Sequence, residues 1–306
     1  MSALAKHPAM RPQSAAGFGA ALRAGSESTG VILRRAIALY SEHFPVFIGI
    51  SLVAYAPLIV LIGWFNLVDR DILPRRFVPT PSRATGIVMF LALIAANLLG
   101  YFTTSAAAAP IVVQLAVAPL REVRIATALT AIVRRWRGWV GATAAVIAMI
   151  MAGTVFFIVP GAVAAVLHAL YAPVAIMEGT TVRDTVRRAR ALARRVLSAS
   201  VAISAIQFAV PILVWTASVK STLVFRLAED YTPKQLGFTF VTSANWSLFQ
   251  LPIVFVAPLT GIMLAQLYLK TRYAGGEALT DAAAQFDALD IPRSRWQLRM
   301  RARTHS

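Results

Sequence analysis

Apolar runs that alternate with arginine-rich segments constrain this chain more than any other feature. The clearest case is residues 171–198, which read YAPVAIMEGTTVRDTVRRARALARRVLS. The stretch begins as the end of an apolar run, passes a turn at Glu178-Gly179, becomes rich in arginine and returns to apolar sequence at Val196. About 20 apolar residues cross a bilayer, and basic amphipathic helices lie at its surface. The pattern therefore predicts a span leaving a membrane, a surface helix and a second span re-entering.

The composition agrees with a membrane location. Hydrophobic residues make up 58% of the 306 residues and charged residues only 14%, against about 25% charged in a soluble domain. The net charge of +17 would also suit nucleic acid, but the arginines cluster at the ends of apolar runs. We therefore expect the lipid bilayer and its anionic phospholipids as partners, and no nucleic acid. The absence of cysteine excludes disulfides and thiolate chemistry.

Six apolar runs predict an all-α polytopic membrane helical bundle with six transmembrane helices. The run at 87–120 is too long for one crossing and too short for two. We therefore expect a single long helix there, kinked near Gly100, residues 103–105 or Pro110. Pro160-Gly161 is predicted to form the tight turn of a hairpin between the third and fourth spans. The predicted spans are residues 44–67, 87–120, 139–159, 162–176, 196–218 and 246–269.

Three basic amphipathic interfacial helices are predicted to precede the first, third and fifth spans. They begin near Val31, Arg124 and Val182, and each runs into its span without a break. The third opens with Thr181-Val-Arg-Asp184, which resembles a capping box. Its apolar and basic positions recur at steps of three and four, on separate faces. The apolar face holds Val182, Val186, Ala189, Ala193 and Val196, and the basic face Arg183, Arg187, Arg190 and Arg194, widened by Arg188 and Arg195.

The alternation predicts a threefold repeat of helix, span, loop and span. The alternative is that any alternating membrane chain looks repetitive. The predicted organisation is a flexible cytoplasmic tail at 1–30, a six-span membrane domain at 31–272 with repeats at about 31–120, 121–177 and 178–272, and a polar cytoplasmic tail at 273–306.

The arginines of the interfacial helices have two interpretations. They either contact the phosphates of anionic headgroups, or they only fix topology, since basic loops between spans are expected on the cytoplasmic side. The candidate headgroup ligands are Arg124, Arg134, Arg135, Arg183, Arg187, Arg190 and Arg194.

The distribution of basic residues predicts the orientation. Most Lys and Arg residues lie in the N-terminal tail, the two arginine segments and the C-terminal tail, so both termini are expected in the cytoplasm. The predicted outer loops hold only Arg70, Arg75, Arg76, Arg83, Lys220, Arg226 and Lys234.

Three motifs carry a family resemblance over roughly residues 31–285. They are the Pro-Gly pair of the hairpin, YAPVAIMEGTTVRDTVRRARAL and PLTGIMLAQLYLKTRYAGGE. Together they resemble the bacterial multi-span family of the glycerophosphoryl diester phosphodiesterase membrane domain and the YciC-like proteins. The resemblance implies six spans in a bacterial inner membrane. It does not imply phosphodiesterase activity, because the catalytic part of that enzyme is a separate soluble barrel for which this chain has no room.

No catalytic constellation stands out, so we expect no enzyme, no cofactor and no metal site. The four histidines, His7, His43, His168 and His305, are not spaced as metal ligands. Nucleophile-elbow, P-loop and dinucleotide-binding motifs are missing.

Polar residues inside the predicted spans are the remaining site candidates. His168 is the one ionisable residue in a span, and we favour a structural hydrogen bond between helices over a functional role. The absence of Asp and Glu from the middle of the spans argues against ion-coupled transport. The intramembrane polar candidates are His168, Gln114, Gln207 and Gln266, which either join helices or line a cavity.

Three functional hypotheses follow. The first is a non-enzymatic integral inner-membrane protein that organises or regulates an envelope or lipid-related process. The alternative is a transporter or lipid-handling protein with a cavity between the repeats. A membrane enzyme with a site around His168 is the third. A homo-oligomer and a membrane partner protein are both compatible with the sequence.

Overall fold

The computed structural model describes residues 28–69, 83–117, 123, 125–207, 209, 213, 252–275 and 277, and this part of the chain is helical with no strand. Most of the two predicted tails, residues 70–82 and 220–244 of the predicted outer loops, Arg124 and the last part of the fifth span lie outside these residues. The helices are α2 (Thr29–Glu42), α3 (Phe44–Ala54), α4 (Ala56–Asp69), α5 (Arg83–Val117), α6 (Ile125–Arg134), α7 (Trp136–Phe156), α8 (Ile158–His168), α9 (Tyr171–Glu178), α10 (Val182–Arg195), the helix Leu197–Gln207, and α14 (Pro252–Ala274).

Four stretches of the described helices are long and apolar enough to cross a membrane, which makes this an all-helical protein of membrane type. A fifth is reached if α2 and α3, which meet at an 87° bend, count as one broken span. The four correspond to the second, third, fourth and sixth predicted spans. They are Leu91–Val117, Trp136–Val155, Val159–Glu178 and Pro252–Ala274.

The first predicted span, 44–67, is divided at Tyr55 into α3 and α4. Pro57 has no backbone N–H to donate, yet hydrogen bonding continues across the junction. The Tyr55 N–H donates to the Ser51 carbonyl at 2.8 Å, and the Ile59 N–H donates to the Tyr55 carbonyl at 2.9 Å. The second predicted span is a single helix, α5, with Pro110 inside it, as expected.

The turn of the α7–α8 hairpin lies at Phe157, so the prediction of a turn at Pro160-Gly161 was wrong. Phe157 is extended, with φ −161° and ψ 150°. Pro160 and Gly161 instead lie in the first turn of α8, where a proline costs little because the first N–H groups of a helix have no partner inside it. A Cβ on Gly153 would lie 2.8 Å from the Gly161 backbone nitrogen. The glycines therefore allow the two helices to approach closely.

One non-helical residue separates each basic helix from the helix that follows it. These residues are His43 (φ −113°, ψ 29°), Arg135 (φ −111°, ψ 17°) and Val196 (φ −136°, ψ 62°). The expectation that these helices enter their spans without a break was therefore wrong. At His43 the two helices meet at an 87° bend.

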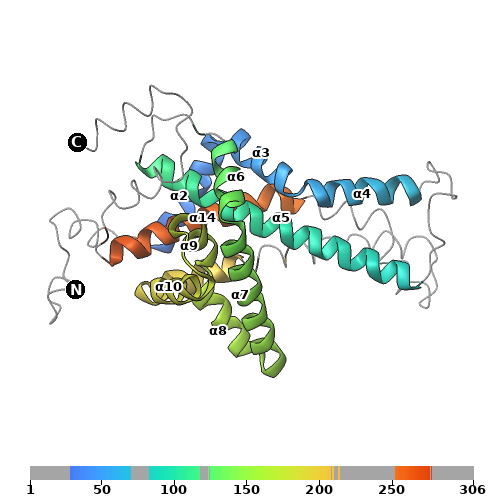
Figure 1. The fold of residues 1–306 in the computed structure, drawn as a ribbon. Helices are drawn as coiled ribbons and strands as arrows, with labels where there is room; N and C mark the ends of the chain where they lie inside the picture. The colour runs from blue at the N-terminus through green and yellow to red at the C-terminus, as the bar shows by residue number, and fades with distance from the viewer. Residues whose placement is uncertain are drawn as a thin grey trace.

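The core is built around α5, α9 and α14. Residues 106–109 of α5 are four buried alanines, and a Cβ on Gly261 of α14 would lie 3.0 Å from the Ala108 Cβ. Small residues at this crossing allow close backbone approach, as in membrane bundles. From this centre α4 and α5 extend together in one direction and the α7–α8 hairpin extends in another (Figure 1). Large apolar side chains such as Val60 and Val155 are exposed on these arms, as lipid contact requires.

Candidate functional site

The start of α10 is fixed by two local devices. Gly179 ends α9 in the left-handed conformation at φ 62°. Thr181 is the N-cap of α10: its hydroxyl accepts from the Asp184 N–H at 3.3 Å and donates to the Asp184 carboxylate at 2.7 Å. The predicted turn at Glu178-Gly179 and the predicted cap are both confirmed.

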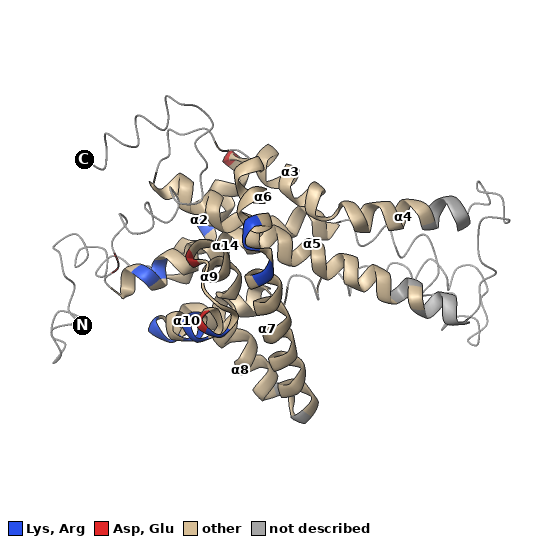
Figure 2. Cartoon of the chain, viewed as in Figure 1, with Lys and Arg blue, Asp and Glu red and all other residues tan. Residues whose placement is uncertain are grey.

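The two sides of α10 differ sharply in their surroundings. One side buries Thr185, Ala189, Leu192 and Ala193, in contact with α7, α8, α9 and α14. The other side, which we call the arginine face, exposes Arg183, Arg187, Arg190 and Arg194. In Figure 2, Lys and Arg gather on α10, near the α6–α7 junction and toward the C-terminal end of α14.

Arg188 and Arg195 do not widen the arginine face, contrary to the sequence prediction. Both reach toward α14 and bind Glu277, at 2.6 Å and 3.0 Å. Arg188 also lies 3.3 Å from the Glu178 carboxylate. Arg272 of α14, which is 3% exposed, donates to Glu277 at 2.7 Å. We call Glu178, Arg188, Arg195, Arg272 and Glu277 the ion-pair cluster.

The ion-pair cluster ties together segments that are far apart in the chain. The Tyr268 hydroxyl donates to Glu178 and accepts from Arg272, both at 3.1 Å. The Arg195 guanidinium also donates to the Thr271 carbonyl at 3.4 Å. The cluster thereby fixes α10 to the ends of α9 and α14, and so fixes which side of α10 is exposed.

Electrostatics within the cluster favour its charged state. Burial alone would raise the pKa of Glu277, but Arg188, Arg195 and Arg272 outweigh it and lower that pKa. Burial opposes the charge on Arg188, yet Glu178 and Glu277 together raise its pKa. The group is therefore held together as a set of opposite charges rather than as neutral hydrogen bonds.

Arg135 has a structural position rather than an exposed one. It lies between α6 and α7, and its guanidinium donates to the Ile176 carbonyl near the end of α9. A Cβ on Gly179 would lie 2.6 Å from the Arg135 Cζ. Burial and the neighbouring Arg134 lower the pKa of Arg135. Arg134 itself is exposed at the last residue of α6.

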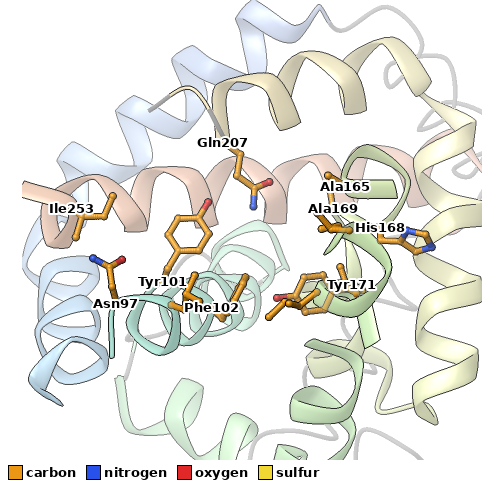
Figure 3. Close-up of a pocket in the computed structure, with 13 residues that line it drawn as sticks. Asn97, Tyr101, Phe102, Ala165, His168, Ala169, Tyr171, Gln207 and Ile253 are labelled. Carbon is orange, nitrogen blue, oxygen red and sulfur yellow. The ribbon is translucent and has the colours of Figure 1, made fainter. Parts of the chain in front are cut away.

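A second candidate site is a cavity of about 220 Å³. Its walls come from α5, α7, α8, α9, α14 and the helix Leu197–Gln207, and Figure 3 shows its lining residues. Most of the lining is apolar. Three buried oxygens have no hydrogen-bond partner among the described residues: the hydroxyls of Tyr101 and Tyr171 and the Oε1 of Gln207.

The structure brings only two of the predicted intramembrane polar residues, His168 and Gln207, to this cavity. The His168 Nδ1 lies 2.8 Å from the Ala164 carbonyl of its own helix, and its ring points away from Tyr101 and Gln207 (Figure 3). Gln114 is buried elsewhere in the protein. Gln266 contacts α2, with its side-chain amide oriented so that both of its polar atoms are hydrogen-bonded. The amide nitrogen donates to the Ile32 carbonyl at 3.0 Å, and the amide oxygen accepts from the Ala36 N–H at 3.3 Å.

Sequence reasoning missed Tyr101 and Tyr171. Tyrosine in membrane helices is concentrated at the two interfaces, whereas Tyr101 lies well inside the apolar run of α5. The position of Tyr101 far from either end of the apolar run was the sequence signal that could have identified it as a candidate. Among the described residues no group of His, Asp or Glu has the arrangement of a metal site.

Comparisons of this chain with protein-family models, with curated proteins and with solved structures find no match. The family resemblance therefore rests on its three sequence motifs alone.

Proposed function

We propose that this chain is a non-enzymatic integral membrane protein that docks a basic helix on anionic lipid and so organises or regulates an envelope or lipid-related process. The observation that carries the proposal is the division of α10. One side is held by the ion-pair cluster, and the other presents four arginines to the surroundings. An arginine face fixed in this way meets lipid phosphates without first having to be ordered.

The energetics suit reversible but firm contact with a lipid surface. Each basic residue near an anionic leaflet contributes about 1 kcal/mol, and the contribution falls with salt. The side chain of Arg187 is 79% exposed, and among the described residues its ion pair is with Asp184 on the same helix, at 2.9 Å. Such an exposed pair is weak, so it competes little with a phosphate.

The proposal places the protein in a bacterial inner membrane with six spans and both termini in the cytoplasm. The positive-inside distribution of Lys and Arg supports this orientation. The three single-residue junctions at His43, Arg135 and Val196 support the threefold helix-span-span repeat. Each basic helix would then lie on the cytoplasmic surface, and the chain would turn sharply into the bilayer after it.

Native mass spectrometry of a charge variant tests the docking. The triple variant Arg187→Gln, Arg190→Gln and Arg194→Gln removes most of the arginine face and leaves the ion-pair cluster intact. We expect it to retain fewer molecules of phosphatidylglycerol and cardiolipin than the parent. The matched control replaces the same three residues with Lys, which keeps the charge and should retain lipid close to the parent level. Equal retention by all three proteins would leave these arginines with a topological role alone.

A second candidate function is lipid handling or transport through a cavity between the repeats. The cavity favours it, because its lining residues come from all three predicted repeats. A reconstituted lipid-transfer or flux assay separates the two candidates, since a purely organising protein would move nothing.

A further inference from the structure

We infer that the cavity lined by Tyr101, Tyr171 and Gln207 is a binding site for an uncharged lipid whose head carries a hydroxyl group, such as a diacylglycerol. The inference rests on the proposed membrane location and deepens the lipid-handling candidate, but it is independent of the arginine face. Its basis is that three unpartnered oxygens belong to residues that line one apolar cavity.

The unpartnered oxygens define the head of the ligand. Buried polar atoms in proteins are nearly always hydrogen-bonded, and each exception calls for an explanation. The hydroxyls of Tyr101 and Tyr171 and the Oε1 of Gln207 come from α5, α9 and the helix Leu197–Gln207. A tyrosine hydroxyl both donates and accepts, and an amide oxygen only accepts. A ligand hydroxyl, which also does both, satisfies such a set.

Tyr101 and Gln207 do not already satisfy one another. The Tyr101 hydroxyl points toward the Gln207 side chain in Figure 3, and Gln207 and Thr260 are its polar neighbours. Neither meets it with hydrogen-bond geometry, and the Thr260 hydroxyl donates to the Ala257 carbonyl at 2.8 Å. The Tyr101 hydroxyl and the Gln207 Oε1 therefore keep hydrogen-bonding capacity that a ligand in the cavity can use.

The ligand must be uncharged. No Asp, Glu, Lys or Arg is among the described residues that line the cavity, and the His168 ring is turned away (Figure 3). A phosphate placed there would be a buried charge without a counter-charge, which costs several kcal/mol. The cavity also lies within the candidate spans Leu91–Val117 and Trp136–Val155, away from the arginine face that would suit a phosphate.

The ligand must also carry a hydrocarbon chain. The cavity of about 220 Å³ has the volume of about seven waters at ~30 Å³ each, enough for a small head and the first methylene groups. Leu98 lines the cavity and is also exposed on the apolar surface of α5. The remainder of a chain can leave past Leu98 and lie along that surface.

The test combines lipid retention with stability. The purified full-length protein in detergent is mixed with 1,2-dioleoylglycerol, with dioleoylphosphatidic acid or with glycerol, and bound molecules are counted by native mass spectrometry. We expect retention of the diacylglycerol alone. Each of Tyr101→Phe and Tyr171→Phe should weaken its binding about fivefold, since one neutral hydrogen bond is lost. Retention of phosphatidic acid as strongly as diacylglycerol, or of glycerol alone, overturns the inference.

The stability arm excludes a purely structural role for the two hydroxyls. Without lipid, Tyr101→Phe and Tyr171→Phe should melt at or above the parent temperature, because an unsatisfied buried hydroxyl has been removed. Tyr40→Phe is the matched control, since the Tyr40 hydroxyl donates to the Phe255 carbonyl at 2.7 Å. It should lower the melting temperature and leave diacylglycerol retention unchanged. Cavity variants that melt lower than the parent and still retain the lipid contradict the inference. The arginine-face variants should bind diacylglycerol as the parent does. A negative result in this test would therefore leave the docking proposal standing, and a negative docking result would leave this inference standing.

Discussion

Replacing Glu277 with Gln should loosen α10 from the bundle. The Glu277 carboxylate accepts from Arg188 at 2.6 Å, Arg272 at 2.7 Å and Arg195 at 3.0 Å. A glutamine keeps the shape and removes the charge, so the three guanidinium groups lose the carboxylate on which they converge. The arginine face would then no longer be held in one orientation.

The expected loss of unfolding free energy in Glu277→Gln lies between that for breaking an exposed ion pair and that for breaking a buried one. Exposed ion pairs contribute about 0–1 kcal/mol, and removing one partner of a buried pair costs about 3–5 kcal/mol. The Glu277 side chain is 21% exposed, Arg188 is 31% exposed and Arg272 is 3% exposed. We therefore expect a loss of about 2 kcal/mol, which corresponds to a fall of about 4–8 °C in melting temperature for a protein of this size.

Thermal unfolding in detergent measures the effect, with Asp184→Asn as the matched control. Within the described part of the chain, the ion pair of Asp184 is with the exposed Arg187 of its own helix, and an asparagine can still accept from the Thr181 hydroxyl. The loss of the charge should therefore cost under about 1 kcal/mol. Equal shifts in the two variants, or no shift in Glu277→Gln, would refute the assignment of the ion-pair cluster as the element that holds α10.

The pH dependence follows from the sign of the pKa shift. The pKa of folded Glu277 lies below its ordinary value of 4.5. Its contribution to stability is therefore complete above that value and is lost as the pH falls through the lowered pKa. On acidification, the melting temperature of the parent protein should fall further than that of Glu277→Gln. Equal falls in the two proteins would contradict a stabilising role for the Glu277 charge.

Two further predictions concern the start of α10. Gly179→Ala should cost about 2 kcal/mol or more by thermal unfolding, because alanine disfavours φ 62° and its Cβ would displace the Arg135 guanidinium; an unchanged melting temperature would contradict this. Thr181→Ala removes the N-cap and should cost about 1 kcal/mol, whereas Thr181→Ser should stay close to the parent.

Hydropathy and periodicity predict the helices because these signals are local. The long helix α5, the capping box of Thr181 and the surface arginines of α10 all depend on residues close in the sequence. The turn at Phe157 was mispredicted because a Pro-Gly pair suits both a turn and the first turn of a helix. Local patterns do not distinguish these two placements.

Contacts between distant segments explain what the sequence did not reveal. Arg187 and Arg188 are equivalent members of a basic helix by spacing, yet only Arg188 meets Glu277, which lies 89 residues away. Arg135 belongs by sequence to a basic segment, but its position depends on where α9 ends. The cavity around Tyr101 and Tyr171 likewise requires the packing of six helices, so no pattern in one segment predicts it.

Labelling of single cysteines tests the central claim that α10 lies on the cytoplasmic surface of a membrane-spanning protein. The chain has no cysteine of its own, so Ala191→Cys on the exposed side of α10 and Ser82→Cys in the predicted outer loop are clean probes. In intact cells an impermeant thiol reagent should label Ser82→Cys and leave Ala191→Cys unlabelled until the inner membrane is opened. Labelling of Ala191→Cys but not Ser82→Cys in intact cells would contradict the account.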